Sequence, residues 1–372
     1  MANQIFHNAF DGRKVFVTGH TGFKGSWLTH WLVSLGADVT GYGLVPPTSP
    51  AHFDLLGLSE KIHHVVGDVR DLAMLKETMR AARPEIVFHL AAQPLVRLSY
   101  AEPRETFETN VMGTINVFEA VKSTDSVSSI VNITSDKCYN NREIDHAYTE
   151  DEAMGGFDPY SASKGAAELV TSAYRNSFFT PESGIQLASV RAGNVIGGGD
   201  WAVDRIIPDS VRALSTNTPI EVRNPSAIRP WQHVLEPLAG YLWLGARMLT
   251  EEKRLDSAYN FGPTPEGHLT VENVVNAIVS TWGSGSWNTP ASHVTQPHEA
   301  HFLKLNSSRA EQVLGWKPVW NSAETLTRTA AWYRDFYLQE KSAVKLTDAD
   351  INAYVTAARA ADVAWSRHEA TQ

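Results

Sequence analysis

The amino-acid sequence predicts an α/β protein built on a doubly wound parallel sheet, with a smaller C-terminal domain. Three observations lead to this prediction. In the first half of the chain, short runs rich in β-branched residues alternate with longer helical patterns. A glycine-rich segment, 19–25, joins the first run to the first helical pattern. Beyond about Gly193 the alternation loosens, so we expect one domain over residues 1–193 and a second, mainly for substrate binding, over 194–372.

The strands and helices of the first half are predicted in alternating order, as a parallel sheet with right-handed crossovers requires. The first helix should run from Phe23 to Leu35, because Gly36 is a C-terminal stop signal. Strands are expected at 14–18, 38–43, 62–66, 86–89 and 129–134, and further helices at 71–82, 104–122 and 160–179. Helices of the second half are expected at 271–282, 307–314, 323–337 and 347–367.

Composition restricts the function. The chain has 372 residues, 43% of them hydrophobic, which is enough to bury a large core. A formal net charge of -9 excludes the broad basic surface of general nucleic-acid binding, so local arginines must meet an anionic ligand. The one cysteine, Cys138, excludes an intramolecular disulfide and is expected to be a small hydrophobic strand residue. Residues 1–13 lack the layout of a secretion signal and no apolar stretch could span a bilayer, so we expect a cytoplasmic protein.

The glycine-rich segment reads Gly19-His20-Thr21-Gly22-Phe23-Lys24-Gly25. Its position between a strand and a helix suits a dinucleotide, because free backbone amides and the helix dipole bind a pyrophosphate, as in Rossmann-like folds. The G-x-x-G-x-x-G spacing differs from the G-x-G-x-x-G fingerprint, and alone it could equally be a tight turn. The flanking strand and helix favour the cofactor. We assign to it Gly19, Thr21, Gly22, Phe23, Lys24 and Gly25.

The region after the second strand indicates which dinucleotide binds. An acid for the ribose 2′-hydroxyl is usual there, but 41–44 contain none. No Arg or Lys follows before Lys61, so only Lys24 could meet a 2′-phosphate, and NAD is favoured over NADP. Asp68, followed by Val69, is expected at the adenine edge or else as a helix cap. The residues that end the fourth strand should let the flat cofactor approach: Leu90, Ala91, Ala92 and Gln93.

Tyr160 and Lys164 are four residues apart in a predicted helix and therefore share one face. An ammonium beside a phenol stabilises the phenolate, which is a base for alcohol oxidation. A free tyrosine has a pKa of about 10, so work near neutral pH requires that pKa to fall to about 7. Lys164 and a cationic nicotinamide are the expected causes. An exposed Tyr-Lys pair without function is the alternative.

The segment Ser135-Asp136-Lys137 closes an apolar run, 130–134. Ser135 could donate a hydrogen bond to the oxygen of Tyr160 or cap a turn. Asp136 and Lys137 form an acid–amine pair, a second proton-handling site that a simple alcohol dehydrogenase would not need. Such a pair can hold one mobile proton, with the neutral amine as base and the protonated carboxyl as acid. A structural salt bridge is the alternative. Together the two sites predict oxidation of a sugar followed by loss of water.

Several motifs together resemble the extended short-chain dehydrogenase/reductase family, over roughly residues 13–340. They are the glycine-rich segment, His89-Leu90-Ala91-Ala92-Gln93, Thr109-Asn110-Val111-Met112-Gly113-Thr114, the Tyr160/Lys164 pair and Arg229-Pro230-Trp231. Thr134-Ser135-Asp136-Lys137 is similar to the Ser-Thr-Asp-Glu segment of its nucleotide-sugar 4,6-dehydratases, with Lys137 in place of the glutamate. That substitution, the glycine-rich segment through Trp27 and Gly197-Gly198-Gly199-Asp200-Trp201 are similar to the members that act on CDP-glucose.

The resemblance implies a chemistry and its partners. Hydride would leave the sugar C4 for NAD and return to C6 after loss of water, with CDP-glucose as substrate and deoxysugars for O-antigen and other surface polysaccharides as the outcome. The catalytic residues would be Ser135, Asp136, Lys137, Tyr160 and Lys164, and Thr134 would contact the cofactor. The helices at 104–122 and 160–179 would form a dimer interface. Asn194 would contact the substrate phosphate or sugar. Apart from the resemblance, Arg205, Arg223 and Arg229 are candidates for binding the diphosphate and nucleotide, because guanidinium groups bind phosphate bidentately. Trp201 and His301 are expected to line the nucleotide pocket.

Other readings stay open at this point. Asn194 could simply form a turn, and most arginines of an acidic protein lie on its surface. A nucleotide-sugar 4-epimerase uses the same tyrosine and lysine but has no need of Asp136 and Lys137, and the substrate could be another nucleotide sugar. A non-catalytic NAD-sensing regulator is a further alternative, but it would not need a tyrosine base activated by a lysine. The histidines lack the spacing of metal ligands, so no metal is expected.

Overall fold

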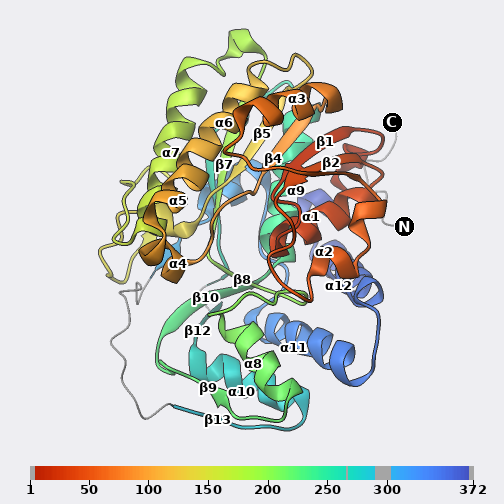
Figure 1. Ribbon diagram of the computed structural model, residues 1–372, viewed down its shortest axis with the longest axis vertical. Coiled ribbons are helices and arrows are strands. Elements are labelled where there is room, and N and C mark those ends of the chain that lie inside the picture. The colour runs from red at the N-terminus through yellow and green to blue at the C-terminus, as the bar shows by residue number, and fades with distance from the viewer. Residues whose placement is uncertain (1–4, 265–266, 290–302, 368–372) are drawn as a thin grey trace.

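The computed structural model describes residues 5–264, 267–289 and 303–367. Its main layer is a seven-stranded sheet in the order β11-β7-β5-β4-β1-β2-β3, and all neighbouring strands are parallel (Figure 1). The strand order reverses between β1 and β4, as in a doubly wound fold, so the predicted fold class is confirmed. The strands are β1 (Lys14–Thr18), β2 (Asp38–Gly43), β3 (His63–Val66), β4 (Ile86–His89), β5 (Ser129–Ile133), β7 (Gln186–Ala192) and β11 (Ala258–Phe261).

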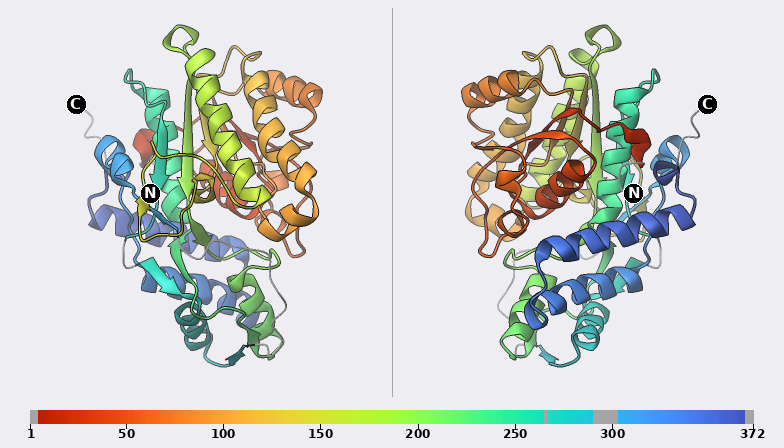
Figure 2. Two further views of the ribbon diagram at one scale, coloured as in Figure 1. Left: turned by 90° about the vertical axis from the view of Figure 1, so that its left-hand side faces the viewer. Right: turned by 90° about the vertical axis from the view of Figure 1, so that its right-hand side faces the viewer.

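Alternate side chains of these strands point to opposite faces of the sheet. Val15 and Val17 of β1 pack with α1 (Phe23–Ser34) and α9 (Leu235–Thr250). Phe16, between them, lies in the core of the other face. That core includes side chains of α3 (Leu72–Ala82), α6 (Gly113–Val121) and α7 (Pro159–Ser177), so helices cover both faces (Figure 2).

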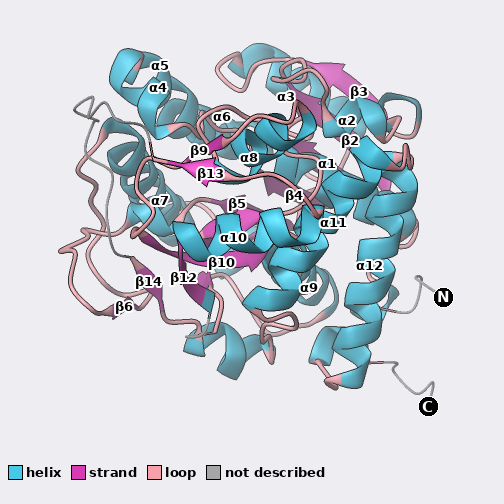
Figure 3. Cartoon of the chain, turned by 90° about the horizontal axis from the view of Figure 1, so that it is seen from below, coloured by secondary structure: helices cyan, strands magenta, loops and turns pink. Residues whose placement is uncertain are grey.

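A smaller lobe lies below the sheet in Figure 1 and has its own hydrophobic core. It begins where β7 ends, because β8 follows directly. Figure 3 looks at this lobe from below, with its short strands and helices in front of the main sheet. Its elements are β8 (Asn194–Ile196), α8 (Ile206–Ser215), β9 (Ile220–Glu221), β10 (Ile228–His233), β12 (His268–Thr270), α10 (Val271–Trp282), β13 (Trp287–Asn288) and α11 (Ser322–Leu338).

The expected division at residue 193 does not describe the sheet. The chain leaves the small lobe after β10, forms α9 on one face of the main sheet, and adds β11 as its edge strand beside β7. The large lobe is therefore built from both halves of the chain. We retain the division only as a proposal about where substrate contacts begin.

Three local predictions differ from the structure. The last helix, expected at 347–367, is α12 (Ala343–Ala360), because the side chain of Ser342 caps its start and the chain then forms a separate turn, Ala364–Ser366. The helix expected at 104–122 comprises α5 (Pro103–Phe107), a π-helical turn (Glu108–Met112) and α6. Cys138 is buried as expected but lies in a 3-10 turn rather than in a strand.

The remaining elements are short. They are α2 (His52–Leu55), α4 (Val96–Ala101), the strand pair β6 (Ala147–Tyr148) and β14 (Lys304–Leu305), 3-10 turns at Phe6–Asn8, Leu58–Glu60, Asp136–Cys138 and Pro181–Ser183, and a π-helical turn at Ala310–Leu314. Phe6 and Trp365 stack with ring centroids 5.0 Å apart, so the two ends of the described chain pack together. Within the described part of the chain, no helix combines the length and apolar character needed to cross a bilayer.

Candidate active site

Helix α7 places Tyr160 and Lys164 on one buried face. The carboxylate of Asp158 caps its start by accepting a hydrogen bond from the backbone N–H of Ser161 at 2.9 Å. The backbone N–H of Tyr160 itself donates to Ser99 Oγ of α4 at 3.1 Å. Tyr160 is 8% exposed and Lys164 6%, so the alternative of an exposed pair is wrong.

Burial changes the acidity of both side chains. It raises the pKa of Tyr160 to about 12, although a hydrogen bond with Ser135 acts in the opposite direction. It lowers the pKa of Lys164 to about 8, while the charge of Glu168 acts in the opposite direction. In the protein by itself, desolvation outweighs the favourable contacts of the phenolate. The expected fall of the tyrosine pKa, which includes the charge of a bound nicotinamide, stays a prediction.

The turn Asp136–Cys138 follows β5 and brings the acid–amine pair to Tyr160. Ser135 caps this turn: its Oγ accepts from the backbone N–H of Lys137 at 3.2 Å and donates to Asp136 Oδ1 at 2.9 Å. Asp136 is buried, and desolvation raises the pKa of its carboxyl although the charge of Lys137 lowers it. The carboxyl of Asp136 is thus a weaker acid than that of a free aspartate. Ser135 caps the turn, which is one of the two roles predicted for it, and it donates its one hydroxyl proton to Asp136, so the predicted donation to Tyr160 stays a prediction.

Lys24 lies in the glycine-rich loop, and its ammonium interacts electrostatically with charged residues of the candidate site. Burial lowers the pKa of its ammonium to about 8, the nearby charge of Asp136 raises it, and the charges of Arg205 and Lys164 lower it further. Its ammonium therefore lies within electrostatic range of Asp136, Arg205 and Lys164.

The glycine-rich loop packs backbone against backbone. Gly19 has φ +72°, and a Cβ atom on it would lie 2.7 Å from the backbone nitrogen of Ala91 at the end of β4. A Cβ atom on Gly25 would lie 2.1 Å from the carbonyl oxygen of Gly19. Gly22, by contrast, has only that oxygen near it, at 3.5 Å. Two of the three glycines are thus required by close approach.

We expect Gly25→Ala to destabilise the protein by about 1–3 kcal/mol, because the added methyl group meets backbone that cannot rotate away. Gly22→Ala is the matched control and should cost under about 1 kcal/mol, since it loses only a small preference at the helix start. Urea unfolding followed by circular dichroism measures both. Equal stability of the two variants would show that the loop relaxes and that its spacing has another cause.

The other cofactor candidates line the ends of β3 and β4. Asp68 binds the guanidinium of Arg70 at 2.6 Å, and this hydrogen bond lowers the pKa of its carboxyl. Asp71, and not Asp68, caps α3 by accepting from the N–H of Met74 at 3.0 Å. Val69 is buried against Gly113. The alternative of Asp68 as the helix cap is therefore wrong.

The residues after β4 are held by hydrogen bonds to their neighbours. The N–H groups of Leu90 and Ala91 donate to the backbone oxygen and the hydroxyl of Thr18, at 3.1 and 3.2 Å. Gln93 exchanges backbone contacts with the side chain of Asn110, whose amide also donates to Ser163 Oγ of α7 at 2.9 Å. The loop 90–93 is thus tied directly to the helix of Tyr160.

The predicted substrate residues fall into different surroundings. Gly193, just before Asn194, lies against the site: a Cβ atom on it would be 3.2 Å from Asp136 Oδ2. Arg205 pairs with Asp200 at 2.9 Å, and its charge reaches Tyr160. Trp201 is buried in the small lobe, and its indole N–H donates to the hydroxyl of Tyr337 at 2.9 Å. The structure places Trp201 in the core of the small lobe, and its predicted place in a nucleotide pocket stays a prediction.

Two more candidates lie nearer the surface, and one falls outside the described residues. Arg223 and Arg97 share one carboxylate, that of Asp204, at 3.3 and 2.9 Å. Arg229 of β10 donates to the backbone oxygen of Ile228 at 3.0 Å. His301 lies outside the described residues.

The comparisons with known proteins agree with this geometry. Residues 16–329 match the family model described as GDP-mannose 4,6 dehydratase. The chain belongs to this family. The predicted resemblance to nucleotide-sugar dehydratases is thereby confirmed.

Relatives of the family extend over nearly the whole chain. A CDP-glucose 4,6-dehydratase of Salmonella typhimurium is 53% identical over 89% of this chain and 93% of its own. A UDP-glucose 4-epimerase of Mycolicibacterium smegmatis is 26% identical over 87% of this chain and 99% of its own. The crystal structure of DesIV, a dTDP-glucose 4,6-dehydratase of Streptomyces venezuelae with NAD and TYD bound, has a TM-score of 0.72 at 24% identity, covering 86% of this chain and 97% of that one.

Two groups of residues near the site were not predicted from the sequence. Arg97 lies on α4, two positions before the serine that binds the Tyr160 backbone, and pairs across the lobes with Asp204. Glu168 and Arg191 form a buried ion pair at 2.7 Å behind the site. Glu168 lies one helical turn beyond Lys164, and this spacing was the one signal that could have found it.

Proposed function

We propose that the protein is an NAD-dependent nucleotide-sugar 4,6-dehydratase and that CDP-glucose is its substrate. The observation that carries the proposal is the meeting of two acid–base pairs in one buried site, since Ser135 contacts both Asp136 and Tyr160. Alcohol oxidation needs one such pair, whereas elimination of water needs a second. The 53% identity to the Salmonella CDP-glucose 4,6-dehydratase supports the choice of nucleotide sugar.

NAD fits the loop between β1 and α1. The close approach of Gly19 and Gly25 leaves a side-chain-free surface at the start of α1, which suits a pyrophosphate. When bound, NAD would accept the C4 hydride and return it to C6, and its oxidised form would bring a positive charge. The loop would bind it through Gly19, Thr21, Gly22, Phe23 and Gly25, with Asp68, Val69, 90–93 and Thr134 as further contacts. The absence of an Arg or Lys between the second strand and Lys61 supports NAD over NADP.

In the oxidation step, Tyr160 takes the proton of the C4 hydroxyl. If the hydroxyl of Ser135 turned from Asp136 to Tyr160, its hydrogen bond would stabilise the phenolate, while burial opposes it. Lys164 lies one turn along the same buried face and remains cationic below its pKa of about 8. The residues of the chain thus orient the base, and the cationic cofactor would complete its activation.

In the elimination step, the C5 proton and the C6 hydroxyl must leave. The C4 ketone makes the C5 proton acidic, and Lys137 as the neutral amine would take it. Asp136 would protonate the departing hydroxyl, because burial favours its protonated form. A proton must then be returned to C5, and Lys137 carries it.

The charges around the small lobe would hold the nucleotide diphosphate. Arg205 lies nearest the catalytic group, and Arg97 and Arg223 meet at Asp204 from opposite lobes. Guanidinium groups bind phosphate oxygens bidentately, so these side chains suit a diphosphate. Asn194 and Arg229, both on strands of the small lobe, would contact the sugar nucleotide beside them.

Exposed apolar side chains on α5–α7 fit a second copy of this chain. Phe107, Met112, Leu169 and Phe178 are 39–62% exposed although each is large and hydrophobic. We propose that these helices form the dimer interface predicted from the sequence. Location in the cytoplasm and a role in deoxysugar supply likewise stay predictions.

Incubation with CDP-, UDP-, dTDP- and GDP-glucose tests the proposed function. We expect a product lighter by one water from CDP-glucose in the presence of NAD, detected by mass spectrometry. Loss of water from another nucleotide sugar alone would correct the substrate. A product of unchanged mass would identify an epimerase instead.

A further inference from the structure

A buried ion pair, Glu168–Arg191, holds both ends of the turn that carries Asp136 and Lys137. Both side chains are 4% exposed, and Arg191 Nη2 donates to Glu168 Oε2 at 2.7 Å. Oε1 of Glu168 accepts from the hydroxyl of Thr134, the residue before Ser135. Arg191 Nη1 donates at 2.7 Å to the hydroxyl of Tyr139, the residue after Cys138.

The pair also connects this turn to the rest of the site. Glu168 lies on α7 one turn after Lys164, and its charge raises the pKa of that lysine against the effect of burial. Ser189 Oγ of β7 donates to Glu168 Oε2 at 2.9 Å, which fixes the carboxylate from the sheet. Helix α7, strand β5 and strand β7 therefore meet at one carboxylate.

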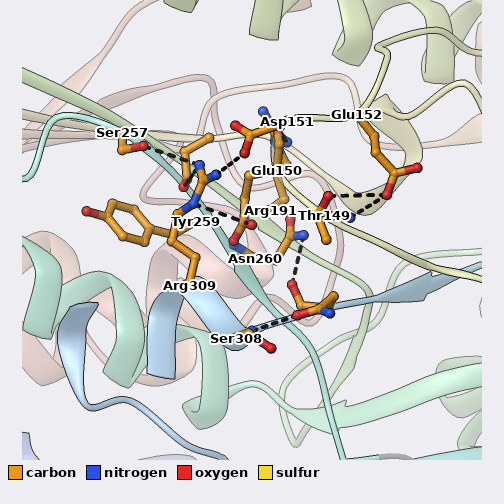
Figure 4. A network of polar contacts seen from close by, with 12 residues as sticks. Thr149, Glu150, Asp151, Glu152, Arg191, Ser257, Tyr259, Asn260, Ser308 and Arg309 are labelled. Atoms are coloured by element: carbon orange, nitrogen blue, oxygen red, sulfur yellow. Dashed lines mark hydrogen bonds and ion pairs between the residues drawn. The ribbon is translucent and has the colours of Figure 1, made fainter. Parts of the chain in front are cut away.

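The far side of Arg191 is anchored as well. Its Nη1 also donates to the backbone oxygen of Glu150 at 3.1 Å, and Glu150 Oε1 accepts from the N–H of Asn260 of β11 at 2.8 Å. Asn260 Oδ1 accepts from the Tyr139 hydroxyl at 2.7 Å. Figure 4 shows Arg191, Glu150 and Asn260 together with Arg309, whose Nε lies 3.7 Å from Glu150 Oε2.

We infer that Glu168 and Arg191 are positioning residues for the elimination step, because they fix the Asp136–Lys137 turn relative to Tyr160 and Lys164. A buried ion pair adds little to stability over apolar side chains of the same size, so its retention here is explained by the geometry that it imposes. Misplacing a reacting group by a fraction of an ångström costs much more in rate than in folding. This inference rests on the proposed function.

The mildest test removes one hydroxyl. Tyr139→Phe deletes the hydrogen bonds of the Tyr139 hydroxyl to Arg191 and Asn260 and keeps the ring over which the guanidinium lies. Tyr148→Phe is the control, because its ring stacks on that of Tyr139 with centroids 5.2 Å apart while its hydroxyl accepts from the N–H of Arg142. After rapid mixing with CDP-glucose and NAD, the signal of reduced nicotinamide measures C4 oxidation. The mass of the product measures dehydration. We expect Tyr139→Phe to slow dehydration about tenfold to a hundredfold relative to oxidation, and Tyr148→Phe to leave the ratio unchanged.

A second variant, Glu168→Gln, tests the link to Lys164. Without the Glu168 charge the pKa of Lys164 should fall further below about 8, so the alkaline limb of C4 oxidation should move to lower pH. Four titratable groups interact electrostatically with Lys164. They are Glu168 on its own helix, Cys138 in the turn, His89 of β4 and Lys24 of α1. A purely structural role would lower activity equally at every pH.

The outcomes separate this inference from the proposed function. If wild type loses no water from CDP-, UDP-, dTDP- or GDP-glucose, both proposals are refuted. The positioning role alone is refuted by a different set of results. Wild type would dehydrate the substrate, Tyr139→Phe would show the same ratio of dehydration to oxidation as Tyr148→Phe, and Glu168→Gln would keep the wild-type pH profile.

Discussion

Tyr160→Phe should lose most of its turnover, by about 10²–10⁴-fold, while it still binds the nucleotide sugar. The phenyl ring fills the same buried space, but no group is left to take the C4 proton beside Ser135. Steady-state rates with CDP-glucose measure the loss, and calorimetric titration of the sugar nucleotide measures binding.

Tyr148→Phe is the control for this substitution, because it removes a hydroxyl that is buried outside the site. Turnover near the wild-type rate in Tyr160→Phe would remove this tyrosine from the mechanism. Loss of sugar-nucleotide binding would instead assign it to substrate recognition.

Lys137→Met should stop the reaction between oxidation and loss of water. The methionine keeps the length of the side chain but cannot take the C5 proton, so dehydration should fall by about 10²–10⁴-fold. Rapid mixing with CDP-glucose should show reduced nicotinamide accumulating, because without elimination C6 offers no acceptor for the hydride. Wild type should show little of this signal.

Lys137→Arg distinguishes the two roles of this amine. A guanidinium keeps the positive charge beside Asp136 but does not release its proton near neutral pH. If Lys137 is the base, the arginine variant should stall as the methionine variant does. Recovery of dehydration in Lys137→Arg would show that the lysine serves only as the electrostatic partner of Asp136.

Most of the main sheet could be predicted from the sequence. Strands β1, β2 and β4 match their expected bounds, because their apolar runs are short and end at glycine or polar residues. The return of the chain to the sheet could not be foreseen in this way. Thirteen of the sixteen residues of α9 are buried, so the helix has no polar face and therefore no clear periodicity.

The site was predictable where its chemistry is local. Tyr160 and Lys164 are one helical turn apart, and Ser135–Lys137 are contiguous, so the spacing indicated which side chains within each group lie together. The surroundings of a side chain were not predictable: the charge of Lys24 interacts with Asp136 from the glycine-rich loop, and Trp201 lies in the small-lobe core.

Contacts between distant segments of the chain could not be predicted from the sequence either. Arg97 and Asp204 meet across 107 positions of the chain, and Arg191 reaches Tyr139 across 52. Nothing in the local sequence of either pair indicates its partner. Only the fold creates them: β5 and β7 lie side by side and bring Arg191 to Tyr139, while Arg97 of α4 meets Asp204 of the small lobe.

The central claim is that one buried site first oxidises C4 and then expels water. The most direct measurement incubates the wild-type protein and NAD with CDP-glucose carrying deuterium at C4 and locates the label by mass spectrometry and nuclear magnetic resonance. We predict a product lighter by one water with the deuterium at C6. A product of unchanged mass, or one dehydrated without deuterium at C6, would contradict the account.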